Sequence, residues 1–301
     1  MRILHFRIDH DLNFAIAMKL ALKSPLILIL LFISSVTIEA QQAGPRREVK
    51  KNPGWQQLDE GLELGVFSAP QSAAAGTSQV RVLRIDPNYY RFRLLNASAI
   101  ENGLPMTPRQ WCRQNKLVAA INPSMFQTDY KTSVSLMRTR THINNPKLTK
   151  DMTILAFDRL SQDVPKAKII DRQCEDYKFW KKKYGTLIQS IRMISCKGIN
   201  VWNQQAHRWS TAAIGVDEQD HVLFIHVQSP YSTHDLINVL KKLPLDISRA
   251  MYTEGGPQAQ LYINTANKEY EFVGSYDTGP NVANESSISW PLPNVVGISK
   301  R

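Results

Sequence analysis

The sequence has few cysteines and lacks the short motifs that mark common metal and hydrolase sites. Its 301 residues include three cysteines and seven histidines. These residues form neither a Cys-x-x-Cys pair nor a zinc-hydrolase spacing. A Gly-x-Ser-x-Gly turn, which carries the nucleophile of α/β-hydrolases, is also missing. We therefore expect no structural metal, no cofactor and no serine-hydrolase chemistry.

A long apolar run is missing as well. The apolar segment around residues 24–33 is about half of the roughly 20 residues that a transmembrane helix needs. It follows Lys19 and Lys23 and leads to small residues that end at Ala40, which is typical of a secretory signal peptide. We expect residues 1–40 to be this signal, with Met18 as the true start. The mature protein should have no stable membrane span and be exported, either to the periplasm or as a secreted protein.

Acidic residues are outnumbered, with 26 Asp and Glu against 37 Lys and Arg. Such a balance can favour nucleic acid, anionic membranes or acidic polymers, but most of this charge is dispersed along the chain. The densest basic cluster is KFWKKKY at residues 178–184. Its aromatic residues could stack on bases, but a solvated loop or helix face explains it better. We expect no nucleic-acid partner.

The three cysteines gain meaning from the predicted export. In an oxidising compartment they should form one disulfide and leave one thiol free. We favour pairing of Cys174 with Cys196, which leaves Cys112 unpaired.

The chain after the signal divides into a polar tail and one domain. Residues 41–57, QQAGPRREVKKNPGWQQ, contain two prolines and are typical of a flexible exported tail. The domain is expected to cover residues 58–301. Thr107 before Pro108 predicts a capped helix over residues 109–115. Ser232 and Asp235 match a capping box before a second helix, which should stop at Pro244.

Alternating or continuous apolar runs predict a sheet-rich domain. Residues 212–217 and 221–227 are joined by a short polar link, which predicts an antiparallel hairpin. The order of strands and helices indicates a single α+β domain with a largely antiparallel sheet and a few helices. The predicted strands cover residues 79–85, 89–95, 116–122, 153–157, 187–194, 212–216 and 222–227.

The segment YTEGGPQAQLYI at residues 252–263 places a carboxyl group beside two glycines between strand-like runs. Gly255 and Gly256 would let a ligand approach the main chain, and Glu254 could act there as acid, base or nucleophile. The alternative is a turn whose glutamate faces solvent.

The segment AAINPSMFQTDY at residues 119–130 is a second candidate. An apolar strand ends at Asn122, whose amide can donate and accept hydrogen bonds, and Pro123 forces a turn directly after it. A binding loop could begin here, although Asn-Pro is also ordinary turn chemistry. His226 could face the same site, but it is better explained as a satisfied histidine within a strand.

Together these segments resemble the phosphodiester glycosidase family. Members typically carry an Asn-x-Gly-x-Phe-like loop, a central Gln-Ser, an Ala-Ile-Gly strand, an Asp-Gly-Gly turn and a final Pro-x-x-x-x-Val-Gly-like strand. The order and spacing agree from roughly residue 80 to residue 299. The matching segments are Asn122 to Phe126, Gln189-Ser190, Ala213-Ile214-Gly215, Glu254-Gly255-Gly256, Leu261-Tyr262 and residues 293–297.

The resemblance implies cleavage of a sugar-1-phosphodiester or a related glycan bond in the cell envelope. Its substrate would be a carbohydrate or sugar phosphate, and two carboxyl groups would normally share the acid and base roles. It implies Glu254 as one catalytic residue and Asp129, beside the Asn122 loop, as the second. The substrate would be bound by Asn122, Gln189, Arg208, Gly255 and Gly256.

The sequence also departs from the family pattern. Glu254 replaces the family aspartate, Pro257 and Gln258 follow the glycine pair, and Ser124 replaces the loop glycine. Thr211 stands where the family commonly has an arginine, with Arg208 nearby. These changes keep a second hypothesis open, in which the chain is a non-catalytic carbohydrate-binding or envelope protein on the same scaffold.

Overall fold

The computed structural model describes residues 54–74, 76–275 and 288–301. The described residues belong to one compact unit, which spans Asn52–Arg301. The predicted signal, the Met18 start and most of the predicted tail lie outside the described residues. The first strand begins at Trp55, three residues before the predicted domain start at Leu58.

The larger sheet has eleven strands, and its strand pairs are antiparallel. β8 (Thr153–Arg159) pairs with β10 (Tyr184–Ile194) and with β9 (Ala167–Asp171) beside the main path of the sheet. That path runs in the order β1 (Trp55–Asp59), β2 (Leu62–Ser68), β3 (Gln79–Ile85), β12 (Val222–Tyr231), β11 (Trp209–Asp217), β13 (Ile247–Gly255), β10 (Tyr184–Ile194), β6 (Met137–Arg138) and β7 (Ile143–Asn145).

The smaller sheet has five antiparallel strands. Their order is β15 (Glu269–Val273), β14 (Gln260–Asn264), β5 (Ala119–Ile121), β16 (Asn294–Lys300) and β4 (Tyr90–Asn96). One hydrophobic core joins the two sheets, because it contains Phe92 and Ile121 of the smaller sheet together with Phe224 and Met251 of the larger one.

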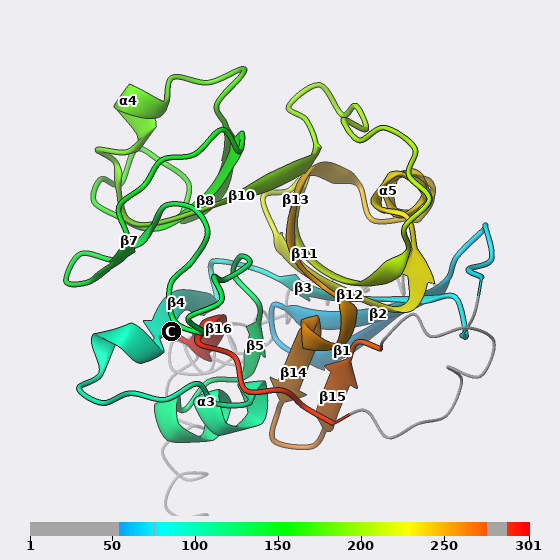
Figure 1. Ribbon diagram of the computed structural model, residues 1–301, viewed down its shortest axis with the longest axis horizontal. Helices are drawn as coiled ribbons and strands as arrows, with labels where there is room; N and C mark the ends of the chain where they lie inside the picture. Colours follow the sequence, from blue (N-terminus) through cyan, green and yellow to red (C-terminus); the bar gives the residue numbers. More distant parts are fainter. Residues whose placement is uncertain (1–53, 75, 276–287) are drawn as a thin grey trace, which may run out of the picture. The chain divides into compact units, whose positions relative to one another are not determined.

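The helices among the described residues are α3 (Pro108–Asn115), α4 (Tyr177–Trp180) and α5 (Thr233–Lys242), with short 3-10 turns η1 (Ala97–Ala99) and η2 (Gly256–Gln258). α5 lies beside the curved strands of the larger sheet, and α3 lies near β5 and β16 of the smaller one (Figure 1). The α+β class and the largely antiparallel sheets predicted from the sequence are confirmed.

Local signals placed both predicted helices correctly. The Thr107 hydroxyl accepts from the Gln110 amide, and the Gln110 side chain accepts from the Thr107 amide. Ser232 caps α5 by accepting from the Asp235 amide. The strand predicted over residues 116–122 is shorter, at Ala119–Ile121, because Lys116 adopts a left-handed conformation that ends α3.

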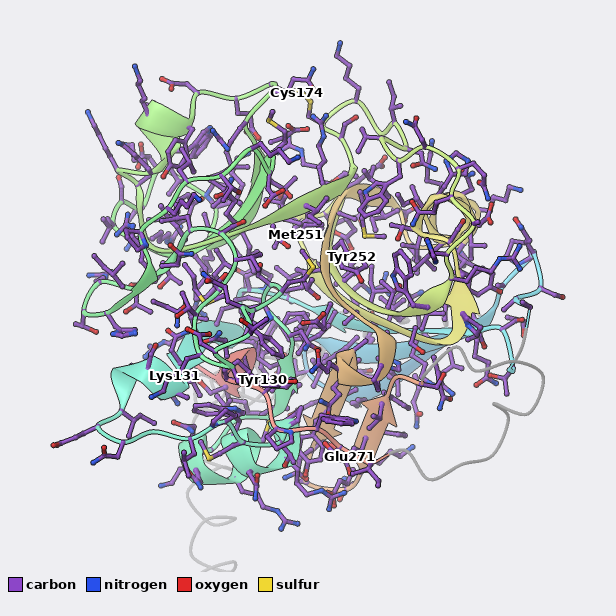
Figure 2. The ribbon with its side chains drawn as sticks, viewed as in Figure 1. Tyr130, Lys131, Cys174, Met251, Tyr252 and Glu271 are labelled. Carbon is purple, nitrogen blue, oxygen red and sulfur yellow. A yellow bond between two sulfur atoms is a disulfide. The ribbon has the colours of Figure 1, made fainter. Side chains whose placement is uncertain are left out.

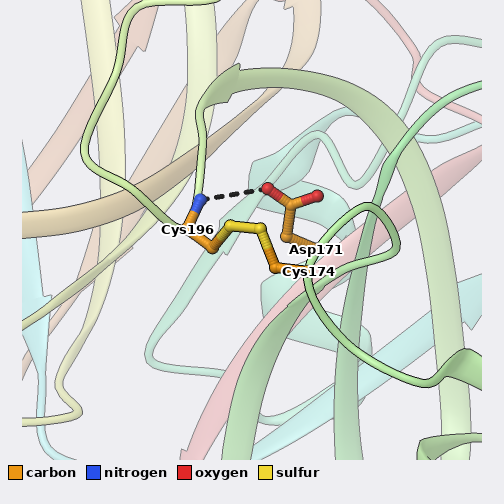
Figure 3. Close-up of side chains that lie close together, drawn as sticks. All are labelled: Asp171, Cys174 and Cys196. Atoms are coloured by element: carbon orange, nitrogen blue, oxygen red, sulfur yellow. Dashed lines mark hydrogen bonds between the residues drawn. A yellow bond between two sulfur atoms is a disulfide. The ribbon is translucent and has the colours of Figure 1, made fainter.

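The predicted hairpin and disulfide are also present. β11 and β12 pair antiparallel. Cys174 and Cys196 form a disulfide, and Cys112 is free and buried. Figure 3 shows this bridge beside Asp171, whose carboxylate accepts from the Cys196 amide at 3.0 Å. Asp171 also pairs with Arg192, so the end of β9 is tied to the end of β10.

The basic cluster at residues 178–184 lies partly in α4, and its lysines are exposed or half-buried. Lys183 pairs with Asp163, and Lys181 and Lys183 lie over aromatic rings. The described residues contain no helix that is both long and apolar enough to cross a bilayer.

Candidate active site

Glu254 lies near the C-terminal end of β13, next to Ala212 of β11. The pairing shifts register between Ala212 and Ala213, so that Thr253 is an extra residue in β13. Such a bulge re-aims the side chains that follow it. It places Glu254 in line with Ala212 and His226, on the face of the sheet that points toward the smaller sheet.

The Glu254 side chain is buried, with 8% of the residue exposed, so the alternative of a solvent-facing turn glutamate is wrong. Its Oε1 accepts from the Gly255 amide at 3.0 Å. None of the ion pairs among the described residues involves this carboxylate. Burial raises the pKa of Glu254 to about 7, although the Gly255 hydrogen bond opposes this shift. The carboxyl group is therefore poised to exchange a proton near neutral pH.

The two glycines after Glu254 differ in their surroundings. A Cβ added to Gly255 would lie 2.0 Å from the Tyr252 hydroxyl and 2.9 Å from the Trp209 ring, so close packing requires glycine there. Gly256 has φ +64°, and an added Cβ would meet no atom within 4 Å. The Gly255 amide donates to Glu254, so it stabilises that carboxylate rather than a substrate oxygen.

Asn122 joins the two segments that the sequence singled out. It is 1% exposed, its Nδ2 donates to the Gln258 carbonyl at 3.0 Å, and its Oδ1 accepts from the Gln260 amide at 2.8 Å. Both partners follow the Glu254 turn directly. The structure thus brings the Asn122 loop and the Glu254 turn side by side, although among the described residues Asn122 itself bonds to the main chain and not to Glu254.

Two serines connect the same loop to β13, and sequence reasoning gave neither a role. The Ser124 hydroxyl donates to the Gln189 carbonyl at 3.1 Å and lies 3.4 Å from the Ser190 hydroxyl. Ser190 in turn donates to the Tyr252 carbonyl. The position of Ser124, where the family has glycine, was the sequence signal that could have drawn attention to this contact.

Some buried polar atoms near the ends of β11 and β13 have no hydrogen-bond partner among the described residues. Six such side-chain atoms occur among the described residues, and three of them are Trp209 Nε1, Thr211 Oγ1 and Thr253 Oγ1. All three belong to β11 or β13, and Thr211 pairs with Gly255. Thr211 is adjacent to Ala212 in β11, so its side chain points to the face of the sheet opposite the one that Ala212 and Glu254 share.

His226 lies in line with Glu254 across β11 but points at the smaller sheet's hairpin. It is fully buried, its Nε2 donates to the Ala259 carbonyl at 3.1 Å, and its ring stacks on Phe272. Nδ1 has no partner among the described residues. Burial, followed by the nearby charge of Arg81, lowers the pKa of His226 to about 3. The residue is a neutral histidine of the core.

The Gln189 side chain bonds to main-chain groups of the segment at residues 136–151. It is fully buried, and its Oε1 accepts from the amides of Leu136 and Thr149. Its Nε2 donates to the carbonyls of Thr149 and Asp151. A side-chain amide offers two donors and two acceptor positions, and all four are used. The substrate contact predicted for this side chain therefore has no free group to make it.

Asp129 and Arg208 are both exposed. Asp129 Oδ1 accepts from the amides of Lys131 and Thr132, and Oδ2 accepts from the Thr132 hydroxyl. These bonds, led by that hydroxyl, lower the pKa of Asp129. The loop tip at Tyr130 and Lys131 lies apart from Met251 and Tyr252 of β13 (Figure 2). The structure gives no contact between Asp129 or Arg208 and Glu254, so their predicted roles stay predictions.

A cavity of about 700 Å³ lies elsewhere, along β4 and the end of β8, and none of the predicted site residues lines it. Glu254, Asn122 and Gln189 therefore do not open onto this cavity.

The comparisons with known proteins agree with the resemblance read from the motifs. The model of the phosphodiester glycosidase family matches residues 115–299. The chain belongs to the phosphodiester glycosidase family. A search of curated proteins finds no match.

Solved structures show that the fold is shared. The chain is similar to the zebrafish N-acetylglucosamine-1-phosphodiester alpha-N-acetylglucosaminidase catalytic domain, auto-inhibited by its pro-peptide. That match has a TM-score of 0.55, 11% identity and coverage of 84% of this chain and 85% of the other. A hypothetical protein from Synechocystis matches with a TM-score of 0.55 and 13% identity, covering 83% of this chain and 64% of the other.

Proposed function

We propose that this family member is an exported hydrolase that cleaves a sugar-1-phosphodiester, with Glu254 transferring the proton. The single observation that carries the proposal is the Glu254 carboxyl group itself, which is buried, without a counter-ion among the described residues, and has a pKa raised to about 7. A general acid or base works best when its pKa lies near the working pH.

The chemistry of the proposed reaction suits such a carboxyl group. In cleavage of a glycosidic bond, positive charge develops at the anomeric carbon while the leaving oxygen needs a proton or the attacking water must lose one. Glu254 exists in both protonation states near neutral pH and can do either.

Export is supported by the Cys174–Cys196 disulfide. Disulfides persist in oxidising compartments and are rare in the cytosol. Together with the predicted signal at residues 1–40, this favours action on a glycan or sugar phosphate outside the cytoplasm.

The test is turnover of a panel of methyl phosphodiesters of hexose and N-acetylhexosamine 1-phosphates. We expect release of free sugar, and a loss of at least about a hundredfold in kcat on Glu254→Gln. Glu218→Gln, an exposed glutamate, is the matched control and should leave kcat unchanged. Release of sugar at an equal rate by the Glu254→Gln variant would exclude Glu254 as the acid or base.

Two observations favour the second candidate, a carbohydrate-binding protein without catalysis. Glu254 does not line the cavity along β4, and Asp129, the predicted second carboxyl group, is engaged in its own turn. In that case the phosphodiesters of the panel would bind without being cleaved, both to the unaltered protein and to the Glu254→Gln variant.

A further inference from the structure

The cavity along β4 is lined by five cationic side chains from four separate parts of the chain. Its volume is about 700 Å³, within the range of small-molecule sites. Arg91 and Arg93 come from β4 and Arg159 from the end of β8, whereas Lys166 precedes β9 and Arg301 follows β16. The fold thus concentrates charge that the sequence disperses.

These cations have no carboxylate partners. None of them takes part in an ion pair among the described residues. Arg93 donates to the Asn115 carbonyl, Arg159 to the Val164 carbonyl and Lys166 to the Asn88 side-chain oxygen, all of them neutral acceptors. These bonds fix the positions of the charged groups and leave their charge uncompensated.

Asp158 is the one acidic side chain among the residues that line the cavity. It is already paired with Arg140 through two hydrogen bonds, at 2.6 and 2.8 Å. The cations also act on one another. The pKa of Arg301 is lowered, mainly by desolvation and then by the charges of Arg91 and Arg159. An anion in the cavity would relieve this repulsion.

The free edge of β4 adds neutral donors. β4 is the last strand of the smaller sheet and pairs with β16 on one side. Six consecutive residues, 91–96, line the cavity. Since successive strand side chains point to opposite faces, this lining places the unpaired strand edge against the cavity. An edge presents main-chain N–H and C=O groups that can bind phosphate oxygens and hydroxyls.

We propose that this cavity binds a phosphorylated sugar, with Arg91, Arg159 and Lys166 on the phosphate. Arginine forks match phosphate oxygens, and lysine adds a point charge. The volume exceeds what a single inorganic phosphate fills, and polar side chains such as Thr141 and Gln162 suit sugar hydroxyls. The site is separate from Glu254 and does not depend on the proposed hydrolysis.

The experiment is isothermal titration calorimetry of the full chain with glucose 6-phosphate, glucose and inorganic phosphate, at 50 and 200 mM salt. We expect glucose 6-phosphate to bind more tightly than either of the others. Arg91→Ala should weaken it about tenfold or more, as loss of a charged hydrogen bond does. The Arg91 side chain is exposed and takes part in none of the side-chain hydrogen bonds or ion pairs found among the described residues, so Arg91→Ala should leave the fold intact.

Arg113→Ala, an exposed arginine outside the cavity, is the matched control and should bind as the unaltered protein does. Glu254→Gln should also bind normally, which separates this site from the proposed activity. The proposal is overturned if glucose 6-phosphate does not bind, or if Arg91→Ala and Arg159→Ala bind it unchanged. Equal affinity for inorganic phosphate would indicate an adventitious anion only, and tighter binding of a single-stranded oligonucleotide would indicate a nucleic-acid site instead.

Discussion

Replacing Glu254 by glutamine should stabilise the protein at alkaline pH. Burial raises the pKa of this carboxyl group from 4.5 to about 7. The folded state therefore binds more protons than the unfolded state between these two values, and its stability falls as the pH rises through that window. Glutamine resembles the protonated carboxyl group in shape and neutrality, so the variant lacks this loss.

The size of the effect follows from the shift. Each pKa unit corresponds to about 1.4 kcal/mol, so the shift from 4.5 to about 7 amounts to about 3 kcal/mol. Glu254 is almost fully buried, so solvent screening reduces this value little. We expect the two proteins to be equally stable near pH 4 and the glutamine variant to be more stable by about 3 kcal/mol at pH 8.5.

Urea unfolding of both proteins at several pH values measures the difference. All other titrating groups are shared, so subtracting the two free energies of unfolding isolates Glu254. Glu218→Gln should differ from the unaltered protein by less than about 0.5 kcal/mol throughout. The raised pKa is refuted if the difference in the free energy of unfolding between the glutamine variant and the unaltered protein is no larger at pH 8.5 than at pH 4. Gain of stability together with loss of turnover is expected of a strained active-site group.

Two further predictions concern buried side chains outside the carboxyl site. Gln189→Leu leaves main-chain groups of Leu136, Thr149 and Asp151 without partners, and should cost about 3 kcal/mol or more in urea unfolding, whereas the exposed Gln114→Leu should cost little. The pKa of His226 is lowered to about 3, so the unfolded state binds the extra proton as the pH falls below 6.5. Relative to His226→Gln, the unaltered protein should lose about 3 kcal/mol between pH 7 and pH 4, and a difference that does not change with pH would contradict the buried neutral histidine.

Local chemistry was enough to predict two helix starts and one hairpin of this fold. The Thr107-Pro108 and Ser232 caps fixed two helix starts, because capping depends on residues three positions apart. The short polar link fixed the β11–β12 hairpin, because a loop of a few residues joins two neighbouring antiparallel strands. The motif order from Asn122 to the last strand indicated the family, and the family in turn implied that Asn122 and the Glu254 turn would meet.

The roles of the side chains at these positions were decided by tertiary contacts. Gln189 carries a family motif, but whether its amide faces a ligand or a loop depends on residues 136–151, which the motif does not mention. The burial of Glu254 follows from a register shift between β11 and β13. The charge of the β4 cavity arises only when strands distant in sequence come together, because electrostatic energy depends on distances in space and a dispersed charge pattern contains no record of them.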